Sequence, residues 1–265
     1  MKLDGSTVLI TGASAGIGRE LARQLGGRAH SLVIVARRRA RLEELRDELA
    51  QSHPDLKVIV RAVDLSKREQ LDELGDWLEQ EKIAIDFLIN NAGLGDRGSF
   101  AVSDLPRVDA MLQVNMAALT LLTHRLLPGM ITRGRGAILN VSSSASFLPM
   151  PTFAVYAASK AYVTGFSEGL RAELRGSGVT VTSLCPGPVH TEFDSVARRA
   201  NASAKGAPEF TYVPVETVAR AALDAVEGDR ALVIPGLAMK LGMALVRLMP
   251  LPVLRFAFKL SRQGL

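Results

Sequence analysis

Apolar segments rich in β-branched residues alternate along this chain with segments of helical periodicity, and this alternation limits the possible folds more than any other feature. We expect strands at 7–10, 32–36, 57–63, 87–89, 137–141, 179–185 and 231–234. We expect helices at 17–26, 39–51, 67–81, 108–133, 156–175 and 215–226. Strands separated by helices form a parallel sheet with helices on both faces. The sequence therefore predicts an α/β fold with a doubly wound, seven-stranded parallel sheet, whose ligand crevice lies at the carboxyl ends of the strands.

Two segments fall outside the alternation. Residues 191–214 are polar, rich in alanine and bounded by prolines, and they directly follow a predicted strand. Long connections in compact domains are often functional, so we expect a lid over the crevice in preference to a plain surface loop. Residues 237–265 follow the last predicted strand. We therefore expect one domain over 1–236 and a C-terminal extension over 237–265.

The positive charge of the chain is concentrated in its last part. The net charge is +5, yet residues 1–229 hold 26 basic and 27 acidic groups, while six basic groups and no acidic group follow Asp229. The body has no basic stripe with interleaved aromatic residues, which argues against nucleic acid as a partner.

The extension itself is amphipathic. Arg255, Lys259 and Arg262 form a basic stripe beside apolar residues, a pattern that suits peripheral contact with an anionic membrane. Prolines and charges interrupt the segment too often for it to span a bilayer. Packing over the crevice or against a neighbouring subunit is an equally weighted alternative.

A glycine-rich turn joins the first predicted strand to the first predicted helix. Gly12 permits a sharp turn, Gly16 permits close approach of the backbone to a pyrophosphate, and Gly18 permits close helix packing. The free amides of the helix N-terminus favour a phosphate. A glycine turn after a strand can also be a plain tight turn, so a Rossmann-type dinucleotide site needs further support.

Basic residues at the end of the second predicted strand supply that support. Arg37 and Arg38 stand where a carboxylate would bind the adenosine ribose hydroxyls of NAD, and an arginine there accommodates the 2′-phosphate of NADP. The alternative is a solvated arginine run that opens a helix. The sequence favours NADP(H) as the cofactor.

A tyrosine, a lysine and a serine suggest proton chemistry. Tyr156 and Lys160 are four residues apart in a predicted helix, so the phenol and the ammonium lie on one face. An ammonium favours a nearby phenolate, so we expect Lys160 to lower the pKa of Tyr156 and make it an acid or base near neutral pH. Ser143 stands at the end of a predicted strand. Each feature alone is also common on surfaces and in turns.

Together these motifs resemble those of the classical short-chain dehydrogenases/reductases over residues 5–235. The matching elements are the turn 11–18, Asp64-Leu65, Asn90-Asn91-Ala92-Gly93, Asn115, Ser143, Tyr156-x-x-x-Lys160 and the segment 186–191. In one departure, Ser14 and Ala15 stand where NADP-preferring members often have a basic residue. Specificity for NADP would therefore rest on Arg37 and Arg38.

The resemblance implies an oxidoreductase that interconverts a carbonyl and an alcohol by hydride transfer. Tyr156 would donate or accept the proton, and Ser143 would orient the substrate oxygen. Lys160 would hold the nicotinamide ribose and depress the pKa of the tyrosine. Asn115 would kink its helix and fix a water in the proton relay.

The resemblance also implies a set of cofactor contacts. Asp64 would contact the adenine, Asn91 would lie along the adenosine side, and Val189 and Thr191 would bind the carboxamide. The full implied set is Gly12, Ser14, Gly16, Ile17, Gly18, Arg37, Arg38, Asp64, Leu65, Asn91, Ala92, Gly93, Tyr156, Lys160, Pro186, Gly187, Val189 and Thr191.

The substrate is harder to infer. The lid segment holds few charges, and apolar residues are expected at the entrance, which favours an apolar ketone, aldehyde or acyl chain. These expected entrance residues are Phe147, Leu148, Met150, Phe153 and Phe193. A different class of function, a catalytically silent NADP(H)-binding sensor or scaffold, has no need to keep all four of the residues Asn115, Ser143, Tyr156 and Lys160.

Three further expectations concern metal, compartment and assembly. The four histidines lack metal-ligand spacing, so we expect no metal site. One cysteine, Cys185, cannot form a disulfide within the chain, which together with the N-terminal sequence favours the cytoplasm. The resemblance implies a homodimer or homotetramer formed through the helices 108–133 and 156–175.

Overall fold

Seven parallel strands form one sheet at the centre of the protein, as the alternation predicts. The computed structural model describes residues 2–197, 208–250 and 252–255. The strands run in the order β3-β2-β1-β4-β5-β6-β7. Their bounds are β1 Thr7–Thr11, β2 Ser31–Ala36, β3 Lys57–Ala62, β4 Phe87–Asn90, β5 Gly136–Val141, β6 Val179–Leu184 and β7 Leu232–Val233. The order reverses between β1 and β4, and such a switch point is where open α/β sheets bind ligands.

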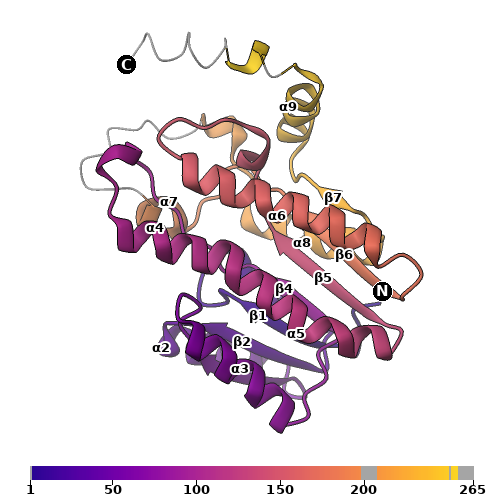
Figure 1. Cartoon of the computed structure of the whole chain (residues 1–265). Helices are drawn as coiled ribbons and strands as arrows, with labels where there is room; N and C mark the ends of the chain where they lie inside the picture. The colour runs from indigo at the N-terminus through magenta and orange to yellow at the C-terminus, as the bar shows by residue number, and fades with distance from the viewer. Residues whose placement is uncertain (1, 198–207, 251, 256–265) are drawn as a thin grey trace.

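Helices cover both faces of the sheet (Figure 1). Their bounds are α1 Gly16–Leu25, α2 Arg39–Ser52, α3 Arg68–Gln80, α4 Leu105–Leu112, α5 Leu119–Thr132, α6 Ala154–Glu173, α7 Glu192–Ala197, α8 Val215–Glu227 and α9 Leu237–Leu248. Side chains of successive strand residues point to opposite faces. Val8 and Ile10 of β1 therefore pack with α1, α2 and α8, whereas Leu9 packs with α3, α5 and α6. The predicted doubly wound α/β fold is confirmed.

The long helix expected over 108–133 is instead broken in two. A π-helical turn over Gln113–Ala118 separates α4 from α5. π-Turns within helices occur mostly at functional sites. This one carries Asn115, which is buried.

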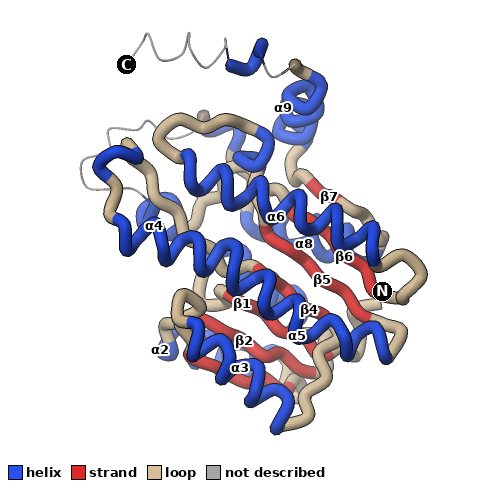
Figure 2. Tube along the Cα trace, in the orientation of Figure 1, coloured by secondary structure: helices blue, strands red, loops and turns tan. Residues whose placement is uncertain are grey.

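The described residues of the segment 191–214, which we expect to be a lid, include two helical elements that the sequence does not predict. Residues 192–197 form α7, and Glu209–Thr211 form a 3₁₀ turn, whereas residues 198–207 lie outside the described part of the chain. Both segments follow β6, so they lie at the carboxyl edge of the sheet. Figure 2 shows α9 at the top of the view, directly after β7.

The extension begins with α9 and continues into a helical turn at 252–255. Of its predicted basic stripe, Arg255 is described, whereas Lys259 and Arg262 lie outside the described residues. Among the helices that the structure describes, none combines the length and the apolar character needed to cross a bilayer.

Candidate active site

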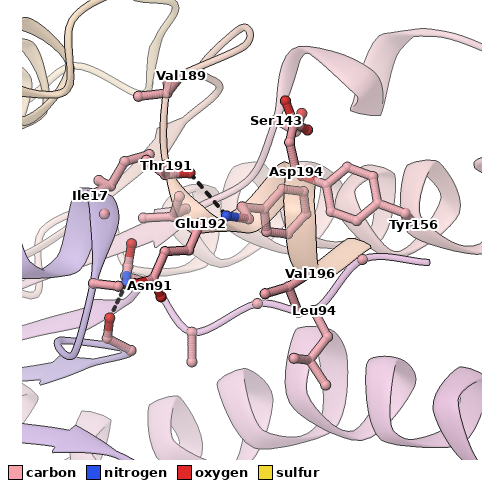
Figure 3. Close-up of a pocket in the computed structure, with 18 of the residues that line it drawn as sticks. Ile17, Asn91, Leu94, Ser143, Tyr156, Val189, Thr191, Glu192, Asp194 and Val196 are labelled. Atoms are coloured by element: carbon pink, nitrogen blue, oxygen red, sulfur yellow. Dashed lines mark hydrogen bonds between the residues drawn. The ribbon is translucent and has the colours of Figure 1, made fainter. Parts of the chain in front are cut away.

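A cleft of about 470 Å³ opens at the carboxyl edge of the sheet, in the size range of small-molecule sites. It runs from the first helix to the start of α6, and Figure 3 shows Ile17 and Asn91 toward one end with Ser143 and Tyr156 toward the other. The predicted site residues that line it are Gly12, Ser14, Gly16, Ile17, Arg37, Arg38, Asp64, Leu65, Asn91, Ala92, Gly93, Ser143, Tyr156, Lys160, Pro186, Gly187, Val189 and Thr191. Gly18 and Asn115 belong to the predicted set but do not line the cleft; both support its walls.

The glycine turn is tightly packed against the loop that follows β4. Gly12 and Gly16 have φ of +69° and +55°, a left-handed conformation that favours glycine. A Cβ at Gly18 would stand 2.6 Å from the carbonyl oxygen of Gly12. Asn91 fixes the turn from the other side, because its Nδ2 donates to the carbonyls of Thr11 and Gly12 at 2.9 and 3.2 Å. The turn therefore has its shape before any ligand arrives.

Thr11 is a part of this turn that the sequence motifs do not single out. Its Oγ1 accepts hydrogen bonds from the backbone N–H groups of Asn91 and Ala92, both at 3.0 Å, and donates to the carbonyl of Ile89. The buried hydroxyl thus joins β1 to the end of β4. A threonine at the end of a strand gives no distinctive sequence signal.

The two arginines after β2 lie at the adenosine end of the cleft and differ in their contacts. Arg38 donates to Glu192 at 2.8 Å and to the Ser14 hydroxyl at 3.3 Å. Arg37 is exposed, lines the cleft and has no ion pair among the described residues. Asp64 lies nearby; partial burial opposes its ionisation, but hydrogen bonds from Ser66 keep the pKa of Asp64 below its usual range.

Tyr156 occupies the opposite end of the cleft in an aromatic environment. Its ring stacks on Phe153 with 4.3 Å between centroids and lies 5.3 Å from the ring of Phe193. Burial raises the pKa of Tyr156 to about 12, although a hydrogen bond with Ser143 acts in the opposite direction. The expectation of a lowered tyrosine pKa is therefore wrong for this structure. Desolvation of the phenolate outweighs the hydrogen bond with Ser143, and the carboxylate of Asp194 raises the pKa further.

Lys160 points into the same end of the site. Its Nζ donates to the carbonyl of Val141 at 2.7 Å and lies 5.8 Å from the centre of the Tyr156 ring. Burial lowers the pKa of Lys160 to about 8, so the side chain is still mainly protonated at pH 7. A Cβ at position 93 would stand 3.3 Å from Lys160 Nζ and 3.6 Å from Asn115 Oδ1. Because Gly93 has no Cβ, the space between these two side chains is not filled.

Asn115 ties the π-helical turn to the loop after β4. Its Oδ1 accepts from the N–H of Leu94 at 2.8 Å, and its Nδ2 donates to the Leu94 carbonyl at 2.9 Å. The same Nδ2 lies 3.0 Å from the hydroxyl of Ser159, which is the residue before Lys160. The helix is interrupted by the π-helical turn at this asparagine, where the resemblance implies a kink, and the asparagine holds three elements of the site together.

The substrate side of the cleft combines the expected apolar residues with charged ones. Met150, Phe153 and Phe193 line it as expected. Phe147 and Leu148 do not; Phe147 instead lies beneath the guanidinium of Arg247 of α9, 5.5 Å from ring centre to Cζ. Other lining residues that the motifs missed are Arg97, Asp194, Val196 and Tyr212.

The other titratable residues singled out in the sequence take no part in the cleft. Cys185 is fully buried at the end of β6, and burial raises the pKa of its thiol. His190 stacks on Tyr212 and pairs with Glu209 at 2.9 Å. Among the described residues, no group of three His, Cys, Asp or Glu side chains is arranged to hold a metal ion.

The cleft fits a nicotinamide dinucleotide. The glycine turn leaves backbone and a helix N-terminus facing the cleft where a pyrophosphate would lie. Arg37 and Arg38 supply positive charge at one end, and Lys160 supplies a buried ammonium at the other. Gly12, Arg38 and Tyr156 therefore lie along one continuous groove, as an elongated two-ended cofactor requires.

Comparison with known proteins agrees with this geometry. The family described as short chain dehydrogenase matches residues 6–202. The very-long-chain 3-oxoacyl-CoA reductase of Anas platyrhynchos is 32% identical over 228 residues, which are 84% of this chain and 69% of the relative.

Solved structures give the same result. A short-chain dehydrogenase from Sphingobium yanoikuyae in complex with NADPH has a TM-score of 0.79 and 30% identity, with 98% of this chain and 94% of that chain covered. The bulky-bulky ketone specific alcohol dehydrogenase from Comamonas testosteroni has a TM-score of 0.77 and 29% identity, with 93% and 95% covered. With the family match extending over most of the sheet, this chain belongs to the short-chain dehydrogenase/reductase family, as an NAD(P)-dependent oxidoreductase that interconverts carbonyl and alcohol groups.

Proposed function

We propose that the protein is an NADPH-dependent reductase of an apolar ketone, aldehyde or acyl-chain carbonyl. The observation that carries the proposal is the position of Tyr156, whose buried phenol stands between Phe153 and Phe193 in the same cleft as the glycine turn. A carbonyl that reaches the phenol must therefore pass among aromatic side chains. Bound NADPH would supply the hydride.

The residues around the phenol would supply the proton chemistry. With a pKa of about 12, Tyr156 keeps its proton at neutral pH, so it can donate that proton to a carbonyl oxygen as the carbonyl carbon gains a hydride. Ser143 would hold the same oxygen by a hydrogen bond. Lys160 would hold the nicotinamide ribose and stabilise the phenolate left behind. The burial that raises the tyrosine pKa thus keeps the phenol in the protonated form that reduction requires at pH 7.

The preference for NADPH rests on the charge at the adenosine end. Arg37 is exposed and without an ion pair among the described residues, so its guanidinium can bind the 2′-phosphate. Ser14 and Arg38 lie beside it and would contribute hydrogen bonds. The related structure from Sphingobium yanoikuyae contains NADPH. Arg37→Asp should lower the ratio of kcat/KM for NADPH to that for NADH; an unchanged ratio would show that Arg37 is only solvated surface.

An apolar substrate is supported by the lining of the cleft. Met150, Phe153, Phe193 and Val196 surround the end that holds the phenol. The names of two relatives point the same way, since one is specific for bulky-bulky ketones and another reduces very-long-chain 3-oxoacyl-CoA. We also propose that residues 191–214 act as a lid, because α7 carries four cleft-lining side chains, Glu192, Phe193, Asp194 and Val196.

We further propose an oligomeric assembly, a cytoplasmic location and a peripheral membrane contact. α5 and α6 lie side by side on one face of the sheet (Figure 1), and the exposed Tyr162 of α6 bonds Thr120 of α5. This face would form a homodimer or homotetramer.

A cytoplasmic location agrees with the single, buried Cys185. The extension would make a peripheral contact with anionic membrane.

The test is NADPH oxidation followed at the absorbance of the reduced nicotinamide with a panel of small polar, long-chain and polycyclic carbonyls. The proposal predicts turnover that is fastest with the apolar members. NADPH binding without turnover of any carbonyl would favour the sensor or scaffold alternative. Fastest turnover of the small polar carbonyls would contradict the apolar-substrate proposal.

A further inference from the structure

Exposed apolar side chains gather at the edge of the sheet where the cleft opens. The described part of the chain has thirteen exposed large hydrophobic residues. Ten of them lie at 100–105 after β4, at 196 and 210 after β6, and at 237–253 after β7, and these ten are Phe100, Val102, Leu105, Val196, Phe210, Leu237, Leu241, Leu245, Leu248 and Val253. Because all the strands are parallel, the segments after their carboxyl ends share one edge.

The richest of these segments is α9. Leu237, Leu241, Leu245 and Leu248 recur every three or four residues, so they form one stripe along the helix, and between 58% and 82% of each is exposed. The other side of α9 is attached to the body, because Met243 is buried and Met239 lies against Gly187 of the cleft. The stripe therefore points away from the protein beside the cleft. Isolated exposed leucines are ordinary, but a contiguous stripe marks a contact surface.

The other two segments continue this surface around the opening. The N–H of Arg97 donates to the carbonyl of Ala197 at 2.8 Å, which places the chain that leads to Phe100 beside α7. Val196 of α7 is exposed and also lines the cleft. On the other side, Val213 lies against Gly236, which directly precedes α9. We call the ten residues the apolar rim.

We propose that the apolar rim is a docking surface for an anionic lipid bilayer, with the mouth of the cleft turned toward the lipid. Exposed Asp104 and Glu209 precede Leu105 and Phe210 in the other two segments, so the positive charge that favours this occupant lies along the extension. The described part of the extension carries Lys240, Arg247 and Arg255, and the whole sequence has no acidic residue after Asp229. Apolar side chains next to cations match the interface of a bilayer that contains acidic lipids. Two copies joined through α9 would bring their positive extensions together, which opposes a dimer at this surface.

Docking in this orientation has a consequence for substrate access, and this consequence rests on the proposed function. An apolar carbonyl dissolved in the bilayer could enter the cleft past Val196 and reach Tyr156 without crossing water. Arg247 would lie near the headgroups, since it is an exposed residue of α9, the helix that carries the leucine stripe.

The test is flotation of the full chain with vesicles of phosphatidylcholine alone or mixed with phosphatidylglycerol, at low and high salt. We expect flotation with the anionic vesicles and weaker flotation at high salt. The triple variant L241Q/L245Q/L248Q should lose at least about tenfold in partitioning, because three leucines no longer enter the interface. The double variant V102S/L105Q should lose part of it, since that segment belongs to the same surface.

A matched control is Ile131→Gln, which changes an exposed apolar residue near the end of α5, before β5 begins and so at the opposite edge of the sheet. It should float like the wild type. Sedimentation of the free protein and NADPH-dependent turnover of a water-soluble carbonyl are measured in parallel for the variants of the apolar rim, and both should be unchanged. If the wild type turns over no carbonyl, the proposed function is wrong. The flotation result still tests the docking surface in that case.

Three results would overturn the proposal. The first is a wild type that does not float with anionic vesicles. The second is a leucine triple variant that floats as well as Ile131→Gln. The third is a triple variant whose subunit number in sedimentation falls below that of the wild type, which would show that α9 joins copies of this chain.

Discussion

Arg38 and Glu192 are 154 residues apart in sequence and form an ion pair of 2.8 Å across the opening of the cleft. Arg38 comes from the end of β2, and Glu192 is the first residue of α7, so the pair joins the adenosine end of the cleft to the proposed lid. Both side chains are about half exposed. A carboxylate therefore holds the guanidinium next to the place where we propose that the 2′-phosphate binds.

Glu192 should compete with the phosphate for Arg38. We expect Glu192→Gln to lower the Kd for NADPH by up to about fivefold, the size of effect that an exposed ion pair supports, and to leave the Kd for NADH unchanged. Fluorescence titration with the two nucleotides measures both constants. Glu209→Gln is the control, because Glu209 pairs with His190 instead. Equal effects of Glu192→Gln on NADPH and NADH would rule out competition with the phosphate.

The buried Lys160 should make stability depend on pH in the cofactor-free protein. Burial lowers the pKa of Lys160 from 10.5 to about 8, so the unfolded chain holds this proton more strongly than the folded chain between these pH values. Stability rises with pH wherever the unfolded state binds more protons. Relative to Lys160→Met, the free energy of unfolding of the wild type should therefore rise between pH 8 and 10.5, by at most about 3 kcal/mol.

Urea unfolding at several pH values measures this difference. The comparison with Lys160→Met removes the contributions of the other titrating groups, which both proteins share. Tyr156 titrates in the opposite sense above pH 10, because its folded pKa of about 12 is the higher one. Parallel curves for the two proteins between pH 8 and 10 would mean that Lys160 is not desolvated.

The glycine turn offers a prediction with an internal control. A Cβ at Gly18 would stand 2.3 Å from Asn91 Nδ2 and 2.6 Å from the Gly12 carbonyl oxygen, so alanine must displace the turn. Gly18→Ala should cost about 1–3 kcal/mol of stability, as overpacking does, and weaken NADPH binding. Gly165 lies in α6 with no atom within 4 Å of its Cβ position, so Gly165→Ala should instead add about 0.5–1 kcal/mol. Thermal unfolding and NADPH titration test both; normal binding by Gly18→Ala would contradict the close packing.

The sheet and the cofactor end of the cleft could be predicted because their signals are local. Strand periodicity and the spacing of Gly12, Gly16 and Gly18 depend on residues that are neighbours in sequence. The substrate end could not be predicted in the same way, since Arg97 comes from the segment after β4, whereas Asp194 of α7 and Tyr212 come from the connection between β6 and α8. Residues that come together only in the folded protein have no characteristic spacing in the sequence.

The pKa of Tyr156 could not be predicted from the sequence either. The spacing to Lys160 predicts a lowered pKa, whereas the rings of Phe153 and Phe193 exclude water from the phenol and raise it. The neighbour four residues away is visible in the sequence. The desolvation comes from tertiary packing, and it has the larger effect.

The most direct measurement compares Tyr156→Phe with the wild type in NADPH binding and in NADPH-dependent turnover of the best carbonyl substrate. Phenylalanine keeps the ring between Phe153 and Phe193 but removes the proton donor, so the Kd for NADPH should stay within about twofold while kcat falls at least about a hundredfold. Tyr162→Phe on the same helix removes an exposed hydroxyl that bonds Thr120, and it should behave like the wild type. Turnover by Tyr156→Phe at the rate of Tyr162→Phe would contradict the assignment of Tyr156 as the proton donor.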